Sequence, residues 1–502
     1  MQQEKLSTQG RGIWSVQQLR AVEQAAVAAG IDEFQLVQRA AKAACCALQC
    51  MHPKVARVAI LCGVGNNGAD GYALAAQLKQ AGQNPQLYPV WGGPKTDAAQ
   101  QALTLCKQLS IPQNEAGVLP RKSDADVLVD GLLGVGLSRP LQGQMLEHIQ
   151  QVNQLQLPVL ALDIPSGLHA DSGSMFPEAV RAHGTISFLG LKRGFFMGHG
   201  LGVTGRLMLH NLDVDAVLFP DPEATVFHGK HLQQPLCRRR TASAHKGCFG
   251  RCLVVAGTQG MPGAGVLATH AALRTGAGLV CVATHPQHAA AGAMKHPEAL
   301  WHGVRDAKQL NDLLSNATCV VVGPGLGQET WGKQLWESVS QHKGIPLVVD
   351  ADALGLLAKR PSHSKQWILT PHPKEAAQLL GCNTQDIQRD RFTAAHTLQA
   401  RYGGVVVLKG ACTVVASEKG MLQVCTAGNP GMASAGMGDV LAGILGGLLA
   451  QFFGKVPLQH VAALGVWLHA QAGDKVALQQ GQRGLLARDV IACLQPLVNP
   501  LH

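Results

Sequence analysis

The feature that most constrains the fold is an alternation of short β-branched segments with helix-length segments along most of the chain. Apolar runs such as residues 126–131 and 158–163 lead into turns rich in glycine and aspartate. This alternation is typical of βαβ units, which assemble into parallel sheets. In open parallel sheets the ligand crevice lies at the carboxyl ends of the strands. We therefore expect an α/β fold whose functional residues follow its strands.

An alanine-rich helical region at 15–50, broken at Gly30-Ile31-Asp32, precedes the first predicted strand, and the first half contains predicted strands at 56–62, 126–131, 158–163 and 185–190. The second half contains predicted strands at 251–257, 279–284, 319–325, 346–350, 367–373, 405–410 and 412–417. Helices are expected there at 262–276, 374–381, 387–402, 439–453 and 460–475. The last two strands follow each other directly, which predicts a hairpin around Gly410-Ala411.

The chain length of 502 residues indicates at least two domains, because it exceeds what one ordinary core accommodates. The alternation stops over residues 219–247, which are rich in proline, polar and basic residues. We therefore expect one domain at 1–222, a linker at 223–240 and a second domain at 241–502.

Composition argues against nucleic acid as a partner. The formal net charge is +10, yet the basic residues are scattered, apart from Arg238-Arg239-Arg240, and the chain has only 3 tyrosines. Recognition of single-stranded nucleic acid usually combines basic grooves with aromatic stacking platforms. A mild positive field suits small anionic ligands better.

Cysteine usage and hydropathy favour a cytoplasmic protein. The 14 cysteines form no CxxC pair and no zinc-ligand spacing, and many lie within apolar runs. The first twelve residues lack the apolar segment of a signal peptide. The longest apolar run, residues 440–453, is too short to cross a bilayer and predicts a buried helix instead.

Polar residues at strand ends mark a candidate site in the first half. Asn66-Asn67-Gly68-Ala69-Asp70 occupies a turn between a strand and a helix, where it can equally serve as an Asx-rich helix cap. Asp130 precedes a glycine loop at 131–140, and Asp163 and Ser166 follow the next strand. Oxygen atoms from Asn67, Asp130 and Ser166 suit a hard monovalent or divalent cation.

A second candidate site lies in residues 426–453, where a glycine-rich loop ends in Gly436-Met437-Gly438-Asp439 and continues into an apolar helix. The unpaired N–H groups and the partial positive charge of a helix start suit a phosphate group. Asp439 in this position indicates proton transfer. Lys409 beside Gly410 can bring positive charge to a phosphate, and His372 between two prolines is either a rigid ligand contact or a structural residue.

The motifs GNNGADG, DGLLGVGLSRP, ALDIPSGL and FLGLKRG resemble the amino-terminal domain of the bifunctional NAD(P)H-hydrate repair enzymes over about residues 10–220. The motifs GTQGMPGAG, VVGPGLG, VVDADALGLL, ILTPHPKEAAQLLG, VVVLKGACTVV and GMGD resemble the ADP-dependent NAD(P)H-hydrate dehydratases over about residues 230–500. The resemblance implies a Rossmann-like three-layer α/β/α domain followed by a ribokinase-like α/β domain. It also implies an isomerase that interconverts two epimers and a lyase that consumes one of them.

For the first domain, the resemblance implies Asp163 as the acid and base of the epimerase. Lys192 is a second candidate that could assist Asp163, but its sequence signal is weaker, since a lone lysine after a strand is often a solvated surface group. A potassium ion would be bound by Asn67, Asp130 and Ser166. The implied substrate contacts are Asn66, Asn67, Gly68, Ala69, Asp70, Gly134, Val135, Gly136, Leu137, Ser138, Arg139, Pro140 and Asp163. Ala69 replaces the family's usual glycine, which requires a negative φ at this position.

For the second domain, the resemblance implies ADP as co-substrate together with Mg²⁺, and Asp439 as the base. In this reaction the ring hydroxyl attacks the terminal phosphate of ADP, and loss of phosphate leaves the dihydronicotinamide and AMP. The implied contacts with the hydrated nucleotide are Ala264, Gly327, His372 and Asp439. Those with the adenine nucleotide are Lys409, Gly410, Ala411, Cys412, Thr413 and Gly438.

The expected ligands are therefore hydrated NADH and NADPH, ADP and AMP, without nucleic acid or membrane, in a homo-oligomer. Two alternatives remain open at this point. One is a ribokinase-like vitamin kinase fused to a Rossmann-like regulatory domain, and the other is a binding role in which the first domain recruits a partner. The choice between ADP and ATP and the preference between the two hydrates also stay open.

Overall fold

The computed structural model describes residues 11–500 and divides into two compact units. The first unit ends at Val226 and the second begins at Phe227. The expectation that no signal peptide is present rests mainly on residues 1–10, which lie outside the described range.

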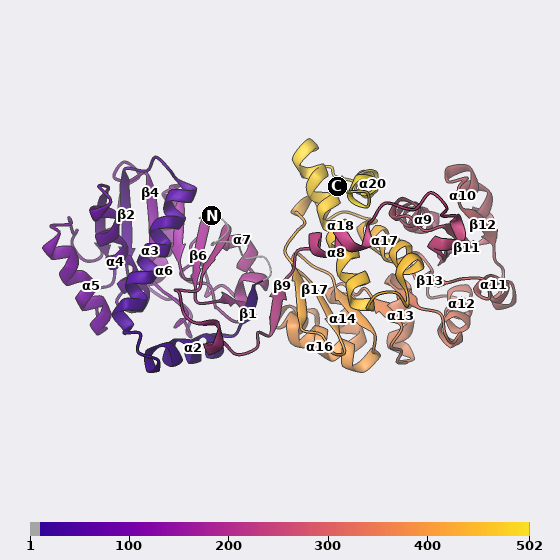
Figure 1. The fold of residues 1–502 in the computed structure, drawn as a ribbon, viewed down its shortest axis with the longest axis horizontal. Helices are drawn as coiled ribbons and strands as arrows, with labels where there is room; N and C mark the ends of the chain where they lie inside the picture. The colour runs from indigo at the N-terminus through magenta and orange to yellow at the C-terminus, as the bar shows by residue number, and fades with distance from the viewer. Residues whose placement is uncertain (1–10, 501–502) are drawn as a thin grey trace. The chain divides into compact units, whose positions relative to one another are not determined.

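The first unit is built on a parallel sheet that continues the βαβ pattern of the sequence (Figure 1). Its strand order is β3 (Asn84–Pro89), β2 (Arg57–Cys62), β4 (Val127–Gly131), β5 (Val159–Leu162), β6 (Gly184–Phe188) and β8 (Arg206–His210). All five strand pairs are parallel, so the carboxyl ends of the strands meet at one edge.

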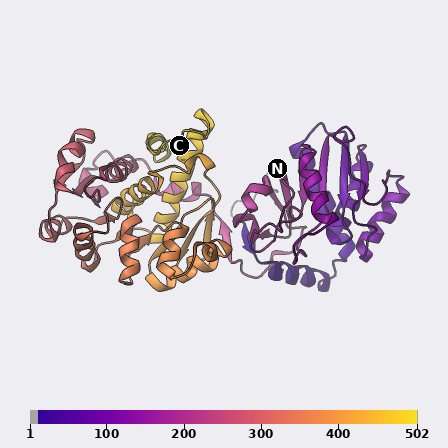
Figure 2. The same cartoon turned by 180° about the vertical axis from the view of Figure 1, so that it is seen from behind.

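Helices cover both faces of this sheet because successive side chains of each strand point to opposite faces. Val58, Ile60 and Cys62 of β2 pack into the core formed with α3 (Glu33–Met51), α4 (Asn66–Gln80) and α5 (Asp97–Gln108). Ala59 and Leu61 pack with α6 (Gln144–Gln154) on the other face. Figure 1 and Figure 2 show the resulting three layers.

Short elements complete the first unit beside the sheet. They are β1 (Gly12–Trp14), α2 (Val16–Ala28), β7 (Leu191–Lys192), η1 (Arg193–Phe196), α7 (Gly200–Thr204), η2 (Ala216–Leu218) and β9 (Ala224–Val226). β1 pairs in parallel with β7 and antiparallel with β9. The pairing of Trp14 with Lys192 fixes the backbone position of that lysine.

The second unit contains a larger sheet in which seven parallel strands continue into two antiparallel ones (Figure 1). The order is β12 (Leu300–Gly303), β11 (Leu279–Thr284), β10 (Arg251–Val255), β13 (Cys319–Val322), β14 (Leu347–Val349), β15 (Trp367–Leu369), β16 (Val405–Leu408), β17 (Thr413–Ser417) and β18 (Leu422–Cys425). β16 and β17 form the predicted hairpin, which is confirmed.

One face of this sheet packs against α9 (Pro262–Thr275), α17 (Met437–Phe452) and α18 (Leu458–Gln480). The other helices are α8 (Lys230–Leu236), α10 (Ala289–Lys295), α11 (Ala307–Leu314), α12 (Thr330–Gln341), α13 (Ala351–Lys359), α14 (Pro373–Leu380), α15 (Thr384–Arg389), α16 (Arg391–Tyr402), α19 (Ala487–Ala492) and α20 (Leu494–Leu497), with 3₁₀ turns η3 (Lys246–Phe249), η4 (Pro286–His288) and η5 (Pro430–Met432).

Glycines allow α17 to lie against α9 at backbone distance. A Cβ atom at Gly443 would lie 2.2 Å from the carbonyl oxygen of Ala268, and one at Gly447 would lie 2.8 Å from that of Ala272. Both contacts are closer than a methyl group tolerates. The glycines within the apolar run therefore determine how α17, and with it the loop at its start, sits on the sheet.

The predicted helical region at 15–50 with a break near Gly30 is confirmed by α2 and α3. The single helix predicted at 387–402 is wrong. Asp390 has φ −145° and its side chain accepts a hydrogen bond from the N–H group of Thr393, so it caps α16 and separates it from α15. The predicted linker at 223–240 contains β9 and α8. Within residues 11–500, no helix combines the length and hydropathy needed to cross a membrane.

We predict that Gly443→Ala lowers the free energy of unfolding of the second unit by about 1–3 kcal/mol, the usual cost of overpacking a tight core. Gly263→Ala is the control, because nothing lies within 4 Å of a Cβ atom at that position. Denaturant unfolding is followed by tryptophan fluorescence, to which this unit contributes five of the seven tryptophans, namely Trp301, Trp331, Trp336, Trp367 and Trp467. Equal stability of the two variants would contradict the close-packing argument.

Candidate functional site

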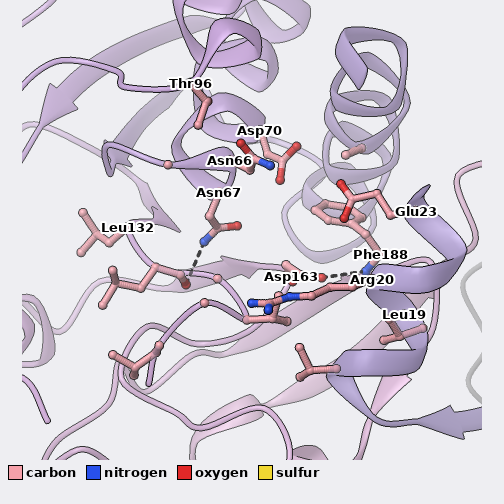
Figure 3. Close-up of a pocket in the computed structure, with 18 of the residues that line it drawn as sticks. Leu19, Arg20, Glu23, Asn66, Asn67, Asp70, Thr96, Leu132, Asp163 and Phe188 are labelled. Atoms are coloured by element: carbon pink, nitrogen blue, oxygen red, sulfur yellow. Dashed lines mark hydrogen bonds between the residues drawn. The ribbon is translucent and has the colours of Figure 1, made fainter. Parts of the chain in front are cut away.

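A cavity of about 710 Å³ opens at the carboxyl-terminal edge of the first unit's sheet. Most of the predicted substrate contacts line it, and Figure 3 shows several of them converging from different elements. The predicted residues in its wall are Asn66, Asn67, Asp70, Gly134, Val135, Gly136, Leu137, Ser138, Arg139, Pro140 and Asp163. The cavity is also lined by Leu19, Arg20 and Glu23 of α2, which the sequence did not indicate.

Asp163 and Lys192 form a buried ion pair in this cavity. The ammonium group of Lys192 donates hydrogen bonds to Asp163 Oδ1, to Ser187 Oγ (2.9 Å) and to the carbonyl oxygen of Phe188 (3.0 Å). Lys192 is only 2% exposed, so its alternative role as a solvated surface group is wrong. Asp163 has a φ of +63°, a strained value for a residue with a side chain. Such strain is common where a side chain must be held in a functional orientation.

Two further carboxyl groups share the cavity with Asp163. Asp70 projects from α4 and Glu23 from α2 (Figure 3). Burial, followed by the charges of Asp163 and Glu23, raises the pKa of Asp70 well above its ordinary value. Burial and the charge of Asp163 also raise the pKa of Glu23. The site therefore combines a charge-paired carboxylate with carboxyl groups that retain their protons more readily, an arrangement suited to acid–base chemistry.

Two predicted contacts, Gly68 and Ala69, do not line this cavity. A Cβ atom at Gly68 would lie 2.0 Å from the carbonyl oxygen of Gly63, and Ala69 is fully buried in the core. Both residues lie on the side of α4 that faces the sheet. Ala69 belongs to that helix and has no positive φ, so its additional methyl group is accommodated as packing.

The three predicted cation ligands meet in one oxygen-rich cluster below the cavity. Ser166 Oγ donates to Asp130 Oδ1 (2.6 Å), and Asp130 Oδ2 accepts from the N–H group of Ser166 (2.8 Å). Asn67 Nδ2 donates to the carbonyl oxygen of Leu133 (3.0 Å), which also lies 3.3 Å from Ser166 Oγ.

This cluster fits a monovalent cation. Asn67 Oδ1 is buried without a hydrogen-bond partner. Asp130 is fully buried, and burial raises its pKa to about 6. One buried carboxylate surrounded by neutral oxygens leaves a negative charge that a cation such as K⁺ would balance. The described residues contain no group of three or more His, Cys, Asp or Glu suited to a metal ion.

In the second unit, Asp439 lies in the first turn of α17, directly after the glycine loop. Gly436 caps this helix with φ +86°, a conformation that favours glycine. Burial, followed by the negative charges of Asp350 and Asp352, raises the pKa of Asp439 to about 6. A carboxyl group with this pKa is ionised at neutral pH and remains basic enough to accept a proton.

Lys409 is held close to Asp439 by two other carboxylates. Its ammonium group lies 2.7 Å from Asp350 Oδ1 and 3.7 Å from Glu375 Oε2. Asp350 also accepts a hydrogen bond from Thr370 Oγ1 (2.7 Å). A Cβ atom at Gly438 would lie 3.4 Å from Lys409 Nζ, so the lysine lies directly beneath the start of α17. The positive charge of Lys409 is thus partly balanced by the carboxylates of Asp350 and Glu375.

The remaining predicted residues lie around this group. The ring of His372 caps α14, with Nδ1 accepting from the N–H group of Glu375 (3.1 Å). The N–H group of Gly327 donates to Asp352 Oδ2 (2.9 Å), and a Cβ atom on Gly325 would lie 3.2 Å from that of Ala264. Residues 409–412 form the turn between β16 and β17.

Several residues of these sites were missed by sequence reasoning. Asp350 and Asp352 directly follow β14 and could have been identified by the rule that already selected Asp130 and Asp163. Glu375 had only the signal of a capping box at the start of a helix. Glu23 carries no local signal, because only the tertiary fold brings α2 to the cavity.

Comparison with known proteins matches both units. Residues 252–496 match the family described as NAD(P)H-hydrate dehydratase, and residues 33–194 match the family described as YjeF-related protein N-terminus. The bifunctional NAD(P)H-hydrate repair enzyme Nnr of Coxiella burnetii is 41% identical over 498 residues, which cover 97% of this chain and 99% of the relative. The enzyme of the same name from Escherichia coli is 38% identical over 491 residues, which cover 97% of this chain and 94% of that relative.

Among solved structures, the ADP/ATP-dependent NAD(P)H-hydrate dehydratase from Bacillus subtilis, co-crystallised with ATP and Mg²⁺, has a TM-score of 0.50 and 29% sequence identity. The match covers 54% of this chain and 96% of that structure.

Proposed function

Since the chain belongs to the family of bifunctional NAD(P)H-hydrate repair enzymes, we propose that its two sites divide the repair of hydrated NADH and NADPH between them. The first unit epimerises the hydrated ring, and the second dehydrates the S epimer. We assign these activities to residues 1–222 and 241–502. The observation that carries the proposal is that each candidate site has a lysine–aspartate ion pair beside a further carboxyl group.

In the first unit, Asp163 is proposed as the acid and base of epimerisation. The hydroxyl group leaves the ring beside a nitrogen that can share the positive charge, and a water molecule then adds to the ring. In its protonated form Asp163 gives its proton to the leaving hydroxyl, and the resulting carboxylate then accepts a proton from the attacking water, which restores the starting state. The ion pair with Lys192 holds the carboxylate at the cavity wall. Asp70 and Glu23 are placed to hold further protons of this site.

Potassium is the proposed cation of the first unit, with Asn67, Asp130 and Ser166 as ligands. Support comes from the unpartnered Asn67 Oδ1 and from the buried charge of Asp130. The ion would supply positive charge beneath the loop that begins at Leu132, whose N–H group is bonded to Asp130 Oδ1 (3.2 Å). Its proposed effect is to hold this loop in the conformation that binds substrate.

In the second unit, Asp439 is proposed to deprotonate the ring hydroxyl, which attacks the terminal phosphate of ADP. A new O–P bond forms, the bond to the bridging oxygen breaks and AMP leaves. The phosphorylated ring then loses phosphate and a ring proton to give the dihydronicotinamide. The N–H groups at the start of α17 would stabilise charge on the transferring phosphoryl group.

The adenine nucleotide is proposed to bind at residues 409–413 and Gly438, and the hydrated nucleotide at Ala264, Gly327, His372 and Asp439. The relative crystallised with ATP and Mg²⁺ supports a nucleotide that carries Mg²⁺ as co-substrate. ADP is our proposal for the donor. Near-full-length similarity to bifunctional relatives favours repair over the vitamin-kinase and partner-binding alternatives. A homo-oligomeric state and a cytoplasmic location remain predictions.

We predict that Asp439→Asn lowers dehydratase kcat/KM by about 100-fold or more, the usual effect of removing a general base. Epimerisation should continue at the wild-type rate in the same protein. In the wild type, dehydratase kcat/KM should fall as pH drops through about 6, since the base must be ionised. Asp312→Asn, on the exposed side of α11, serves as the control. An unchanged pH profile in Asp439→Asn would contradict this role.

A second prediction separates the two activities. Wild-type protein mixed with both epimers of hydrated NADH and with ADP should restore the full absorbance of NADH. With Asp163→Asn, recovery should stop near the share of the S epimer, apart from slow spontaneous epimerisation, because the carboxylate that moves protons is lost. Asp126→Asn, a surface aspartate paired with Arg57, is the control. Complete and equally fast recovery with Asp163→Asn would exclude this residue as the epimerase acid and base.

The third prediction concerns the cation. Potassium should raise the melting temperature of the first unit and its epimerase activity relative to tetramethylammonium at equal ionic strength. A ligand at hundredfold excess over its Kd stabilises a protein by about 2.7 kcal/mol. Asp130→Asn should abolish this difference, whereas Asp126→Asn, a surface aspartate paired with Arg57, should preserve it. A potassium response that persists in Asp130→Asn would rule out this site.

A further inference from the structure

A buried arginine lies behind the turn between β16 and β17. Arg391 is the first residue of α16 and is 4% exposed. Its Nη2 atom donates to the carbonyl oxygens of Leu408 (3.1 Å), Lys409 (3.2 Å) and Cys412 (2.9 Å). One guanidinium group therefore bonds the turn both where it leaves β16, at Leu408 and Lys409, and where it enters β17, at Cys412.

These bonds determine which way the N–H groups of the turn point. A trans peptide unit directs its carbonyl oxygen and the following N–H group to opposite sides. Because the carbonyl of Lys409 points inward to Arg391, the N–H group of Gly410 points away from it. The structure gives this N–H group no acceptor among the described residues. The N–H group of Lys409, by contrast, is bonded to the carbonyl oxygen of Pro371 (2.8 Å).

Position 410 is glycine because the guanidinium group occupies the space of a side chain. A Cβ atom there would lie 2.4 Å from Nη1 and 2.6 Å from Nη2 of Arg391. The two residues are thus matched to each other. The motif Lys409-Gly410, which the sequence indicated for its own charge, depends on a residue 19 positions earlier.

The charge of Arg391 has no carboxylate partner among the described residues. Its other side-chain contact is a long hydrogen bond from Nη1 to Gln388 Oε1 (3.4 Å), and burial lowers its pKa. Buried arginines are usually paired, since an uncompensated buried charge is costly. If the carbonyl groups of the turn needed only hydrogen-bond donors, a neutral side chain could supply them. An anion bound on the opposite side of the turn would balance this cation.

We propose that Arg391 is a positioning residue of the dehydratase, which turns the N–H group of Gly410, in the turn between β16 and β17, toward the phosphate groups of the adenine nucleotide and places a fixed positive charge behind it. The proposal rests on the assignment of this turn to the nucleotide. Arg391 itself contacts no substrate atom and acts through the backbone that it holds.

The test uses full-length Arg391→Met and Arg391→Lys, with Arg389→Met as the matched control. Arg389 ends the preceding helix, and its one ion pair with the described residues is an exposed one with Asp386 (3.8 Å). For each folded variant, three quantities are measured: the Kd of AMP by calorimetry, the KM values of ADP and of hydrated NADH, and the melting temperature.

Arg391→Met should raise the Kd of AMP and the KM of ADP by about tenfold or more, because the turn is no longer held in its orientation and the positive charge behind it is lost. The KM of hydrated NADH should stay within about twofold, and Arg389→Met should match the wild type. Arg391→Lys keeps the charge but lacks the planar fork, so it should give an intermediate increase. If Arg391→Met does not fold, the Arg391→Lys variant decides the question by the same criterion.

Unchanged nucleotide affinity in a folded Arg391 variant would overturn the proposal. Equal loss of affinity for both substrates together with a lower melting temperature would also overturn it, since that is what a merely structural role predicts. A wild-type protein that turns over hydrated NADH without binding AMP or ADP would instead overturn the assignment of the nucleotide site.

Discussion

A largely buried lysine–aspartate ion pair at the carboxyl edge of a parallel sheet is the interaction around which each unit arranges its site. In the first unit Lys192 holds Asp163, and in the second Lys409 holds Asp350. Charges buried in this way are tolerated only when they are paired and hydrogen-bonded, so the surrounding backbone must be accurately placed. Ser187 and Phe188 satisfy the first lysine, and Thr370 satisfies the second aspartate.

Each pair sits beside a carboxyl group whose pKa burial raises, Asp70 in one unit and Asp439 in the other. The two sites share this arrangement but use it differently in our proposal, since the proposed acid and base is the lysine-paired Asp163 in the first unit and the neighbouring Asp439 in the second. The lysine neutralises one carboxylate, and the neighbouring carboxyl group is left more basic because it is desolvated and surrounded by negative charge. In our proposal a proton leaves or reaches a ring hydroxyl at both sites, and a neighbouring carboxyl group with a raised pKa supports this chemistry.

The position of Asp439 depends on packing far from the chemistry. Gly443 and Gly447 allow α17 to approach α9 until backbone meets backbone, and this contact fixes where the helix begins. Gly436 then provides the left-handed turn from which Asp439 and the free N–H groups of the first turn face the ligand side. On the other side of the same site, Arg391 orients the hairpin turn through its carbonyl groups. Helix packing and a buried cation thus together determine the geometry of the site that we propose for phosphate.

The sequence by itself determined the α/β class, the hairpin at Gly410-Ala411 and the strand-end aspartates, because periodicity and turn chemistry are local properties that neighbouring residues express together. It also carried the ordered motifs on which the family assignment depends. Only the tertiary structure decided that Lys192 is buried, that Gly68 and Ala69 pack against the sheet, that Glu23 lines the first cavity and that Arg391 lies behind the hairpin turn. These outcomes depend on which surfaces meet when helices pack on a sheet, and no local pattern encodes such contacts.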